Sequence, residues 1–409
     1  MIAFVVTVFV LAYVGMALGR VPGLRLDRSG IVLIAAVALV AAGAVTPQDV
    51  ISAVHFPTIL LLFALMILSA RFAAAGFYDA CAAWIARHRG SPVFLLAMTV
   101  ATGGLLSAVL VNDVVVFVMT PLLCSGLAAR RLDPRPFLAG LAGASNVGSA
   151  ATLIGNPQNI LIGQVGKLDF LTFLLVCGAP ALIGLGIVFA TVRVVWRRAL
   201  RPSAAGTELP PAAPFDRPQT AKALLATAVL LALFATPLPR EMTAMVIAAV
   251  LLMSRRYASR DMLTSVDWPL LLLFAGLFVI NDAFTRTGLS ADALIWLAER
   301  GWLPDRLSVM APVALLASNT IGNVPAVVML LSIWPDIPTG ALYSLALMTT
   351  FAGNFLLVGS IANLIVAERA LHAGVRFGLI DHARAGIPMT LVTMALAAAW
   401  LWLGGWLDW

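Results

Sequence analysis

Apolar residues fill long stretches of this chain, and no regular polar stripe runs along them. A membrane helix needs about 20 such residues to cross the hydrocarbon core. Stretches of roughly this kind recur along the sequence, at about 2–19, 30–46, 56–76, 137–163, 171–192, 221–236, 239–254, 268–285, 340–366 and 385–407. We therefore predict an all-α integral membrane protein with about ten transmembrane helices.

Two further apolar segments are interrupted near their centres. Residues 91–129 turn at Val111-Asn112-Asp113, and residues 305–335 turn at Gly322-Asn323-Val324-Pro325. Each half of such a segment is short for a straight crossing of a core about 30 Å thick. We predict two re-entrant helical hairpins, because non-helical backbone at membrane depth is tolerated only where it is buried or lines a cavity.

The same succession of features occurs twice along the chain. Ser107 precedes Asn112 by five residues, as Ser318 precedes Asn323, and a second broken apolar segment follows each hairpin. Paired, interrupted segments in two halves of a chain point to the central binding site of a transporter. We predict two repeats of five spans each, at 1–198 and 221–409, with a flexible linker between them at 199–220.

Composition supports a membrane protein. Apolar residues make up 61% of the chain and charged residues 11%. In a soluble domain about half of the residues are apolar and about a quarter are charged. The net charge of +7 is better explained by loop arginines beside anionic headgroups than by nucleic acid. Since the sequence holds neither a catalytic constellation nor a nucleotide-binding loop, we expect no enzyme and no cofactor beyond a coupling ion, Na⁺ or H⁺.

The basic residues predict how the spans are oriented. If the N-terminus is external, alternate loops hold 21 of the 26 Lys and Arg residues. Basic residues collect in cytoplasmic loops, so we place these loops and the linker in the cytoplasm and both termini outside. Five spans are an odd number, which makes the second repeat inverted. Hairpin 91–129 then opens to the cytoplasm, and hairpin 305–335 opens to the outside.

Asn112 and Asp113 are the polar pair at the first hairpin turn. An ionisable residue at membrane depth is costly and is a functional hypothesis by default. Asp113 is a candidate carrier of a coupling cation or proton, and the alternative is that it caps the following helix. Asn112 and its counterpart Asn323 offer an amide oxygen to a cation and N–H groups to an anion.

The run Gly155-Asn156-Pro157-Gln158-Asn159 interrupts the helix after the first hairpin. Its free carbonyl groups suit Na⁺, for which Asn112, Asp113 and Gly155 are the candidate ligands. The new helix N-terminus at Pro157 suits an anion. A simple proline kink is the alternative. The full set of candidate substrate and ion-binding residues is Ser107, Asn112, Asp113, Asn146, Thr152, Gly155, Asn156, Pro157, Asn159, Ser318, Asn323, Asn354, Gly359, Ser360 and Asn363.

The run from Asn146 to Asn159 resembles a signature of the ion transporter superfamily, which contains divalent anion–sodium symporters, arsenical pump membrane proteins and sodium/proton antiporters. The resemblance implies a secondary active transporter of a small inorganic or organic anion, an elevator-type motion, and a homodimer in the lipid bilayer of a bacterial inner membrane. Dicarboxylate symporters carry Ser-Asn-Thr at each hairpin tip, whereas this chain keeps only Asn112 and Asn323.

Two other functions fit the same resemblance. The Asn112-Asp113 pair followed by Thr120-Pro121 is similar to arsenical permeases, which implies arsenite or antimonite efflux and, in a pump, an ATPase subunit. A Na⁺/H⁺ antiporter would use Asp113 as its carrier and would need no anion.

The predicted topology can be tested by labelling. Single cysteines at positions 210 and 340, in a chain whose Cys81, Cys124 and Cys177 have been replaced, should react from opposite sides of the membrane. An impermeant thiol reagent added to intact cells should label only position 340. Labelling of both positions in intact cells would rule out this topology.

Overall fold

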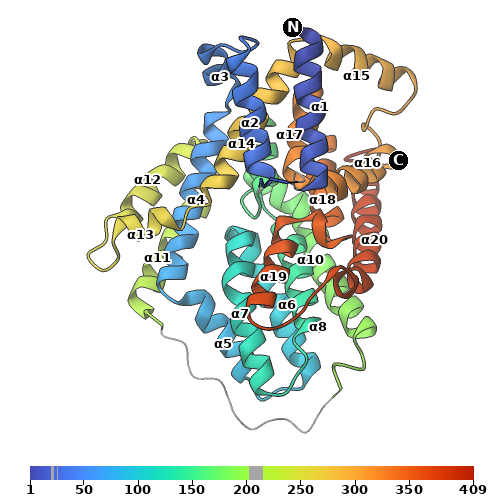
Figure 1. Cartoon of the computed structure of the whole chain (residues 1–409). Coiled ribbons are helices and arrows are strands. Elements are labelled where there is room, and N and C mark those ends of the chain that lie inside the picture. The colour runs from blue at the N-terminus through green and yellow to red at the C-terminus, as the bar shows by residue number, and fades with distance from the viewer. Residues whose placement is uncertain (20–22, 25, 202–214) are drawn as a thin grey trace.

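The computed structural model describes residues 1–19, 23–24, 26–201 and 215–409. Every regular element within these ranges is helical (Figure 1), which agrees with the predicted all-α class. Most of the predicted linker 199–220, including position 210, lies outside the described residues. The helices that flank this gap lie on opposite sides of the molecule (Figure 1).

The first half of the chain contains ten helices among its described residues. They are α1 Ile2–Leu18, α2 Arg28–Ala41, α3 Pro47–Ala53, α4 Phe56–Ala74, α5 Phe77–Arg87, α6 Pro92–Val109, α7 Asn112–Ala129, α8 Arg135–Ser149, α9 Pro157–Val165 and α10 Phe170–Val195. Two short helices, α3 and α5, lie between the spans that the apolar stretches predict.

The second half has a similar order of elements. They are α11 Arg217–Phe234, α12 Arg240–Leu252, α13 Ser259–Thr264, α14 Trp268–Thr285, α15 Leu289–Glu299, α16 Leu307–Thr320, α17 Asn323–Ile333, α18 Thr339–Ala352, the 3₁₀ turn Leu357–Gly359, α19 Ile361–His372 and α20 Leu379–Leu403. The chain leaves α4 through Gly76 and α14 through Gly288, and both glycines have positive φ, 73° and 83°.

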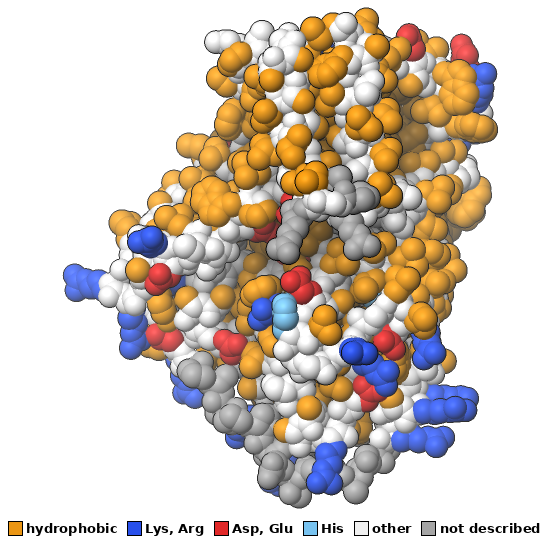
Figure 2. Space-filling view, in the orientation of Figure 1, with side chains coloured by type: hydrophobic (Ala, Val, Ile, Leu, Met, Phe, Trp, Pro, Cys, Tyr) orange, Lys and Arg blue, Asp and Glu red, His pale blue; other side chains and the backbone are white. Residues whose placement is uncertain are grey.

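Within the described residues, six helices are long and apolar enough to cross a membrane: α4, α6, α7, α10, α14 and α20. Shorter apolar helices, α1, α2, α16, α17 and α18, accompany them. Apolar side chains cover much of the visible surface, and Lys and Arg side chains gather towards its lower part (Figure 2). The helices suit a lipid environment, while the number of ten spans and the inverted orientation of the halves stay predictions.

Both interrupted segments form helix pairs that break at the predicted turns. Leu110 and Val111 separate α6 from α7, and Ile321 and Gly322 separate α16 from α17. Gly322 has φ 97°, a backbone conformation that favours glycine. The two halves of each hairpin pack on each other.

The expected spans 137–163 and 340–366 are each two helices. Residues 150–156 separate α8 from α9, and residues 353–360 separate α18 from α19, with only a 3₁₀ turn between them. Each break is longer than the sequence suggested and ends where the next helix begins, at Pro157 and at Ile361. Several consecutive backbone groups therefore lack helical partners in each break.

The helices pack in two groups. One group contains α1 to α4 with α11 to α15, in which α4 packs on α12 and α14 on α2. The other contains α5 to α10 with α16 to α20, in which α6 packs closely on α8 because Gly104 and Gly148 meet at their backbones. The second group carries both hairpins and both broken helices, and it meets the first group at α4 and α14.

Candidate functional site

The first helix break is held by its own amide side chains. Asn156 caps α9, because its Oδ1 accepts a hydrogen bond of 2.8 Å from the backbone N–H of Asn159. Pro157 occupies the first turn, where no N–H is needed. A Cβ atom at Gly155 would overlap the carbonyl oxygens of Ser149 and Ser107, so this position can hold only glycine.

In both breaks, an asparagine of the following helix donates hydrogen bonds back to carbonyl groups of the break. The Asn159 Nδ2 donates to the carbonyl oxygens of Ser149 and Thr152, at 3.3 and 3.0 Å. In the second half, Asn363 Nδ2 donates to Gly353 O at 2.8 Å and Leu356 O at 3.4 Å. The chain separation between donor and acceptors is ten and seven residues in both cases. In each half, an asparagine side chain therefore satisfies carbonyl groups that the interrupted helix leaves without partners.

Each hairpin tip is bonded to the break of its own half. The backbone N–H of Asn112 donates to Gly155 O at 3.3 Å. The Asn323 amide, oriented so that its nitrogen donates, reaches Gly359 O at 3.0 Å and Ser318 Oγ at 3.1 Å. These bonds join each hairpin tip to a break that is distant from it in sequence.

Asn146 joins the two halves. Its Nδ2 donates to Asn354 Oδ1 at 2.7 Å and to Asn363 Oδ1 at 3.0 Å, while its Oδ1 accepts from Ser360 Oγ at 2.9 Å. All four side chains are buried. The network continues to His382 on α20, whose Nε2 lies 2.9 Å from Asn354 O and must carry the proton of that hydrogen bond.

A small cavity lies between the two hairpin tips and the two breaks. Its volume is about 30 Å³, which is enough for about one or two water molecules. Five of its lining residues are the first residues of helices, namely Arg28, Asn112, Pro157, Asn323 and Ile361. The others are Asp113, Asn146, Gln158, Leu273, Gly322, Val324, Pro325, Gly359 and Ser360.

Asp113 and Arg28 are the charged residues among the described lining of this cavity. Asp113 makes no hydrogen bond or ion pair within the described chain, and Val111 takes the N-cap position of α7 without a side-chain bond. The capping role that the sequence offered for Asp113 is thus not seen. Arg28 donates from Nε to Met16 O at 3.2 Å, and its Nη1 lies against Gly322 at the second hairpin tip.

Asp113 also borders a second cavity, of about 360 Å³. Asp267 lines that cavity too, and its Oδ1 accepts from Leu270 N at 3.0 Å as the cap of α14. Burial raises the pKa of Asp267, and the capping bond opposes this effect. The Asp113 carboxyl thus lies between the central cavity and a second acidic residue, Asp267.

The structure divides the fifteen predicted residues into lining and support. Those that line the central cavity are Asn112, Asp113, Asn146, Pro157, Asn323, Gly359 and Ser360. Those that hold the breaks and tips behind it are Ser107, Thr152, Gly155, Asn156, Asn159, Ser318, Asn354 and Asn363. Of the three Na⁺ candidates, Gly155 O already accepts the Asn112 N–H bond.

Three contributors to the site are not predicted by the sequence. Arg28 lies in a predicted loop, although it is the first residue of α2 and reaches the cavity. Gln158 stood within the quoted run but outside the candidate set, and it lines the cavity while donating to Thr350 Oγ1 at 3.2 Å. His382 had no metal-ligand spacing, and its buried place beside Asn354 gave no signal in the sequence.

The Asn146 network predicts a measurable loss of stability. Asn146→Ala removes the donor shared by Asn354 and Asn363, and an unsatisfied buried acceptor costs about 1–3 kcal/mol. We expect thermal unfolding in detergent at a clearly lower temperature. Ser332→Ala is the matched control, because Ser332 Oγ donates to Val328 O within its own helix, at 2.8 Å. Equal unfolding temperatures for the two variants would contradict this role.

Known proteins resemble this chain over most of its length. An uncharacterized transporter of Mycobacterium tuberculosis is 29% identical over 428 residues, with 97% of each chain covered. The silicon efflux transporter of Oryza sativa subsp. japonica is 28% identical, with 92% of each chain covered. The crystal structure of the YdaH transporter of Alcanivorax borkumensis superposes with a TM-score of 0.56 at 15% identity, covering 98% of this chain and 97% of that one.

The family comparison covers most of the chain. Residues 6–337 match the citrate transporter family, and this confirms the resemblance to the ion transporter superfamily drawn from the run Asn146 to Asn159. The match includes the first broken helix, both hairpins and the cavity residues up to Pro325. This multi-pass membrane protein therefore belongs to the citrate transporter family.

Proposed function

We propose that the chain is a secondary active transporter that carries a small anion and couples its movement to Na⁺ or H⁺. The observation that supports this most is the convergence of five helix N-termini on one buried cavity. Each N-terminus carries a partial positive charge from the helix dipole. Together with the Arg28 guanidinium they favour a negatively charged ligand.

The coupling cation would bind to a separate set of atoms, the side-chain oxygens of Asp113 and Asn112. The Asp113 carboxylate has no partner in the described chain, and Asn112 Oδ1 is buried without a hydrogen bond. A carboxylate beside a free amide oxygen suits Na⁺, and the carboxylate alone suits a proton. A cation at Asp113 would also offset the charge of an anion held by the helix N-termini, so the two ligands favour each other.

The cavity size constrains how an anion enters. A volume of about 30 Å³ admits a small ion but no organic anion, so the hairpin tips must separate for a larger substrate. Both hairpins and both broken helices belong to one packing group. We propose that this group moves against the other, as the resemblance to elevator-type transporters implies.

Efflux of a small weak oxyacid is the second candidate function. The relative from Oryza sativa is named a silicon efflux transporter and covers 92% of this chain, and arsenite or antimonite belongs to the same class of small oxyacids. Uptake assays with a panel of anions under imposed Na⁺ or pH gradients distinguish the two. Cation exchange with no effect of any anion would favour a Na⁺/H⁺ antiporter instead.

Asp113→Asn tests the coupling role. The variant keeps the size of the side chain and removes the charge, so it should reach the membrane and still bind the anion weakly. In proteoliposomes its accumulation ratio under a Na⁺ or pH gradient should fall towards one. Asp292→Asn, on the exposed helix α15, is the matched control and should accumulate normally. Full accumulation by Asp113→Asn would refute the coupling role.

Arg28→Gln tests the anion site separately. A hydrogen bond to a charged group contributes about 1.5–3 kcal/mol, so the apparent affinity for the anion should fall roughly tenfold to a hundredfold. Gradient coupling should persist, because Asp113 is intact. Arg376→Gln removes an exposed charge and should leave the affinity unchanged. A normal affinity in Arg28→Gln would exclude this guanidinium from the site.

A further inference from the structure

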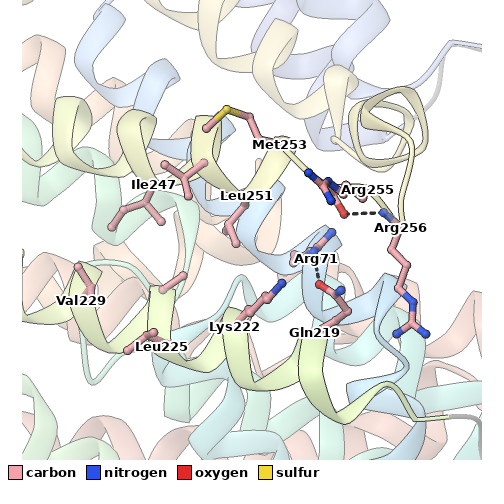
Figure 3. Close-up of a pocket in the computed structure, with 13 residues that line it drawn as sticks. Arg71, Gln219, Lys222, Leu225, Val229, Ile247, Leu251, Met253, Arg255 and Arg256 are labelled. Atoms are coloured by element: carbon pink, nitrogen blue, oxygen red, sulfur yellow. Dashed lines mark hydrogen bonds between the residues drawn. The ribbon is translucent and has the colours of Figure 1, made fainter.

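A large pocket lies away from the central cavity, between α11, α12 and the end of α4. Its volume is about 760 Å³, and none of its lining residues belongs to the central cavity. Figure 3 shows Lys222, Leu225 and Val229 along one helix, and Ile247 and Leu251 along the other. The transport proposal gives this pocket no role.

The walls of the pocket are apolar and open to the surroundings of the helices. Leu225 is 66% exposed and Val250 is 56% exposed, although both are large apolar side chains. Such side chains on a multi-pass membrane protein face acyl chains rather than water. Lys222 and Val229 are seven residues apart on α11, so the apolar wall runs about 10 Å from the lysine along the helix axis.

One end of the pocket is strongly basic. Arg71, Lys222, Arg255 and Arg256 line it. Arg256 already pairs with Asp216, whereas no ion pair within the described chain engages Lys222 or Arg255. Both of these side chains are exposed at the pocket mouth. The pocket therefore has cations that its own residues do not neutralise.

Arg71 is the buried part of this basic end. It is only 4% exposed, and its Nη2 donates to Gln219 Oε1. Its Nε and Nη1 are buried without a hydrogen-bond partner, and its guanidinium lies 4.7 Å from the centre of the Tyr257 ring. A buried charged group with unmade hydrogen bonds is costly, so this guanidinium lacks an acceptor that a bound anion would supply.

We propose that this pocket binds an anionic phospholipid. The phosphate of the headgroup lies among Arg71, Lys222 and Arg255, and the first part of an acyl chain lies between α11 and α12. A free inorganic anion would satisfy the basic end and leave the apolar walls empty. Basic pockets between membrane helices bind lipid headgroups in this way. The bound lipid joins the end of α4 to α11 and α12 within one helix group.

Lipid binding to the purified full chain tests the site. Delipidated protein is titrated with phosphatidylglycerol or with phosphatidylcholine of the same acyl chains, and bound lipid is counted by native mass spectrometry. We expect phosphatidylglycerol to bind at one site at least tenfold more tightly to the parent chain than to the double variant Lys222→Gln, Arg255→Gln. The control double variant Arg217→Gln, Arg260→Gln loses the same charge at exposed positions outside the pocket and should bind like the parent.

Two further outcomes separate a lipid from a free phosphate. Ala226→Trp fills the apolar part of the pocket and should also weaken phosphatidylglycerol binding, while glycerol 3-phosphate at the same concentration should not compete. Equal binding of the two lipids, or parent-like binding by the Lys222 and Arg255 variant, overturns the proposal. Full competition by glycerol 3-phosphate would assign the site to a soluble phosphate instead.

Discussion

Backbone N–H and C=O groups inside a membrane need hydrogen-bond partners from the protein itself, and the two helix breaks place many such groups at the centre of this chain. Asn159 and Asn363 supply the partners, each through one amide nitrogen that reaches two carbonyl oxygens of its own break. These bonds satisfy carbonyl groups that the interrupted helices leave without a helical partner. Both breaks that border the cavity are held in this way.

The breaks determine the electrostatics of the cavity as well as its shape. A helix that begins inside the protein presents N–H groups that its own turns do not satisfy. Helices α7, α9, α17 and α19 begin in this way at the cavity, and α2 adds Arg28. Five positive ends in one place would repel each other strongly if nothing balanced them. Asp113 is the one acidic residue in the described lining, and the anion proposed above would supply further negative charge while it is bound.

Much of this arrangement could be predicted from the sequence, because its signals are local. Asparagine, glycine and proline inside an apolar stretch mark a helix that cannot continue, and both hairpin turns lie where Asn112 and Asn323 indicated. Asn146 was found because it belongs to the same polar run. Its partners Asn354, Asn363 and Ser360 were all in the candidate set, although only the fold shows that one side chain joins them.

The missed residues depend on contacts between elements that are distant in sequence. Arg28 follows an apolar helix and looks like an ordinary loop charge until α2 and the second hairpin tip are brought together. His382 lacks any spacing that suggests a ligand, and its role follows from the approach of α20 to Asn354. The short helices α3 and α5 are too short for a membrane pattern to reveal them. Periodicity reports local structure, whereas these features arise from packing.

The contact between Arg28 and Gly322 has a consequence for how the cavity opens. Arg28 belongs to the helix group without hairpins, and Gly322 is the tip of the second hairpin in the other group. The movement proposed above, of one group against the other, would therefore separate the guanidinium from the hairpin tip. An anion held by both would resist that separation in proportion to its charge, and a neutral oxyacid would not. If the chain moves in the way proposed above, the charge of the substrate would affect both its binding and the ease with which the cavity opens.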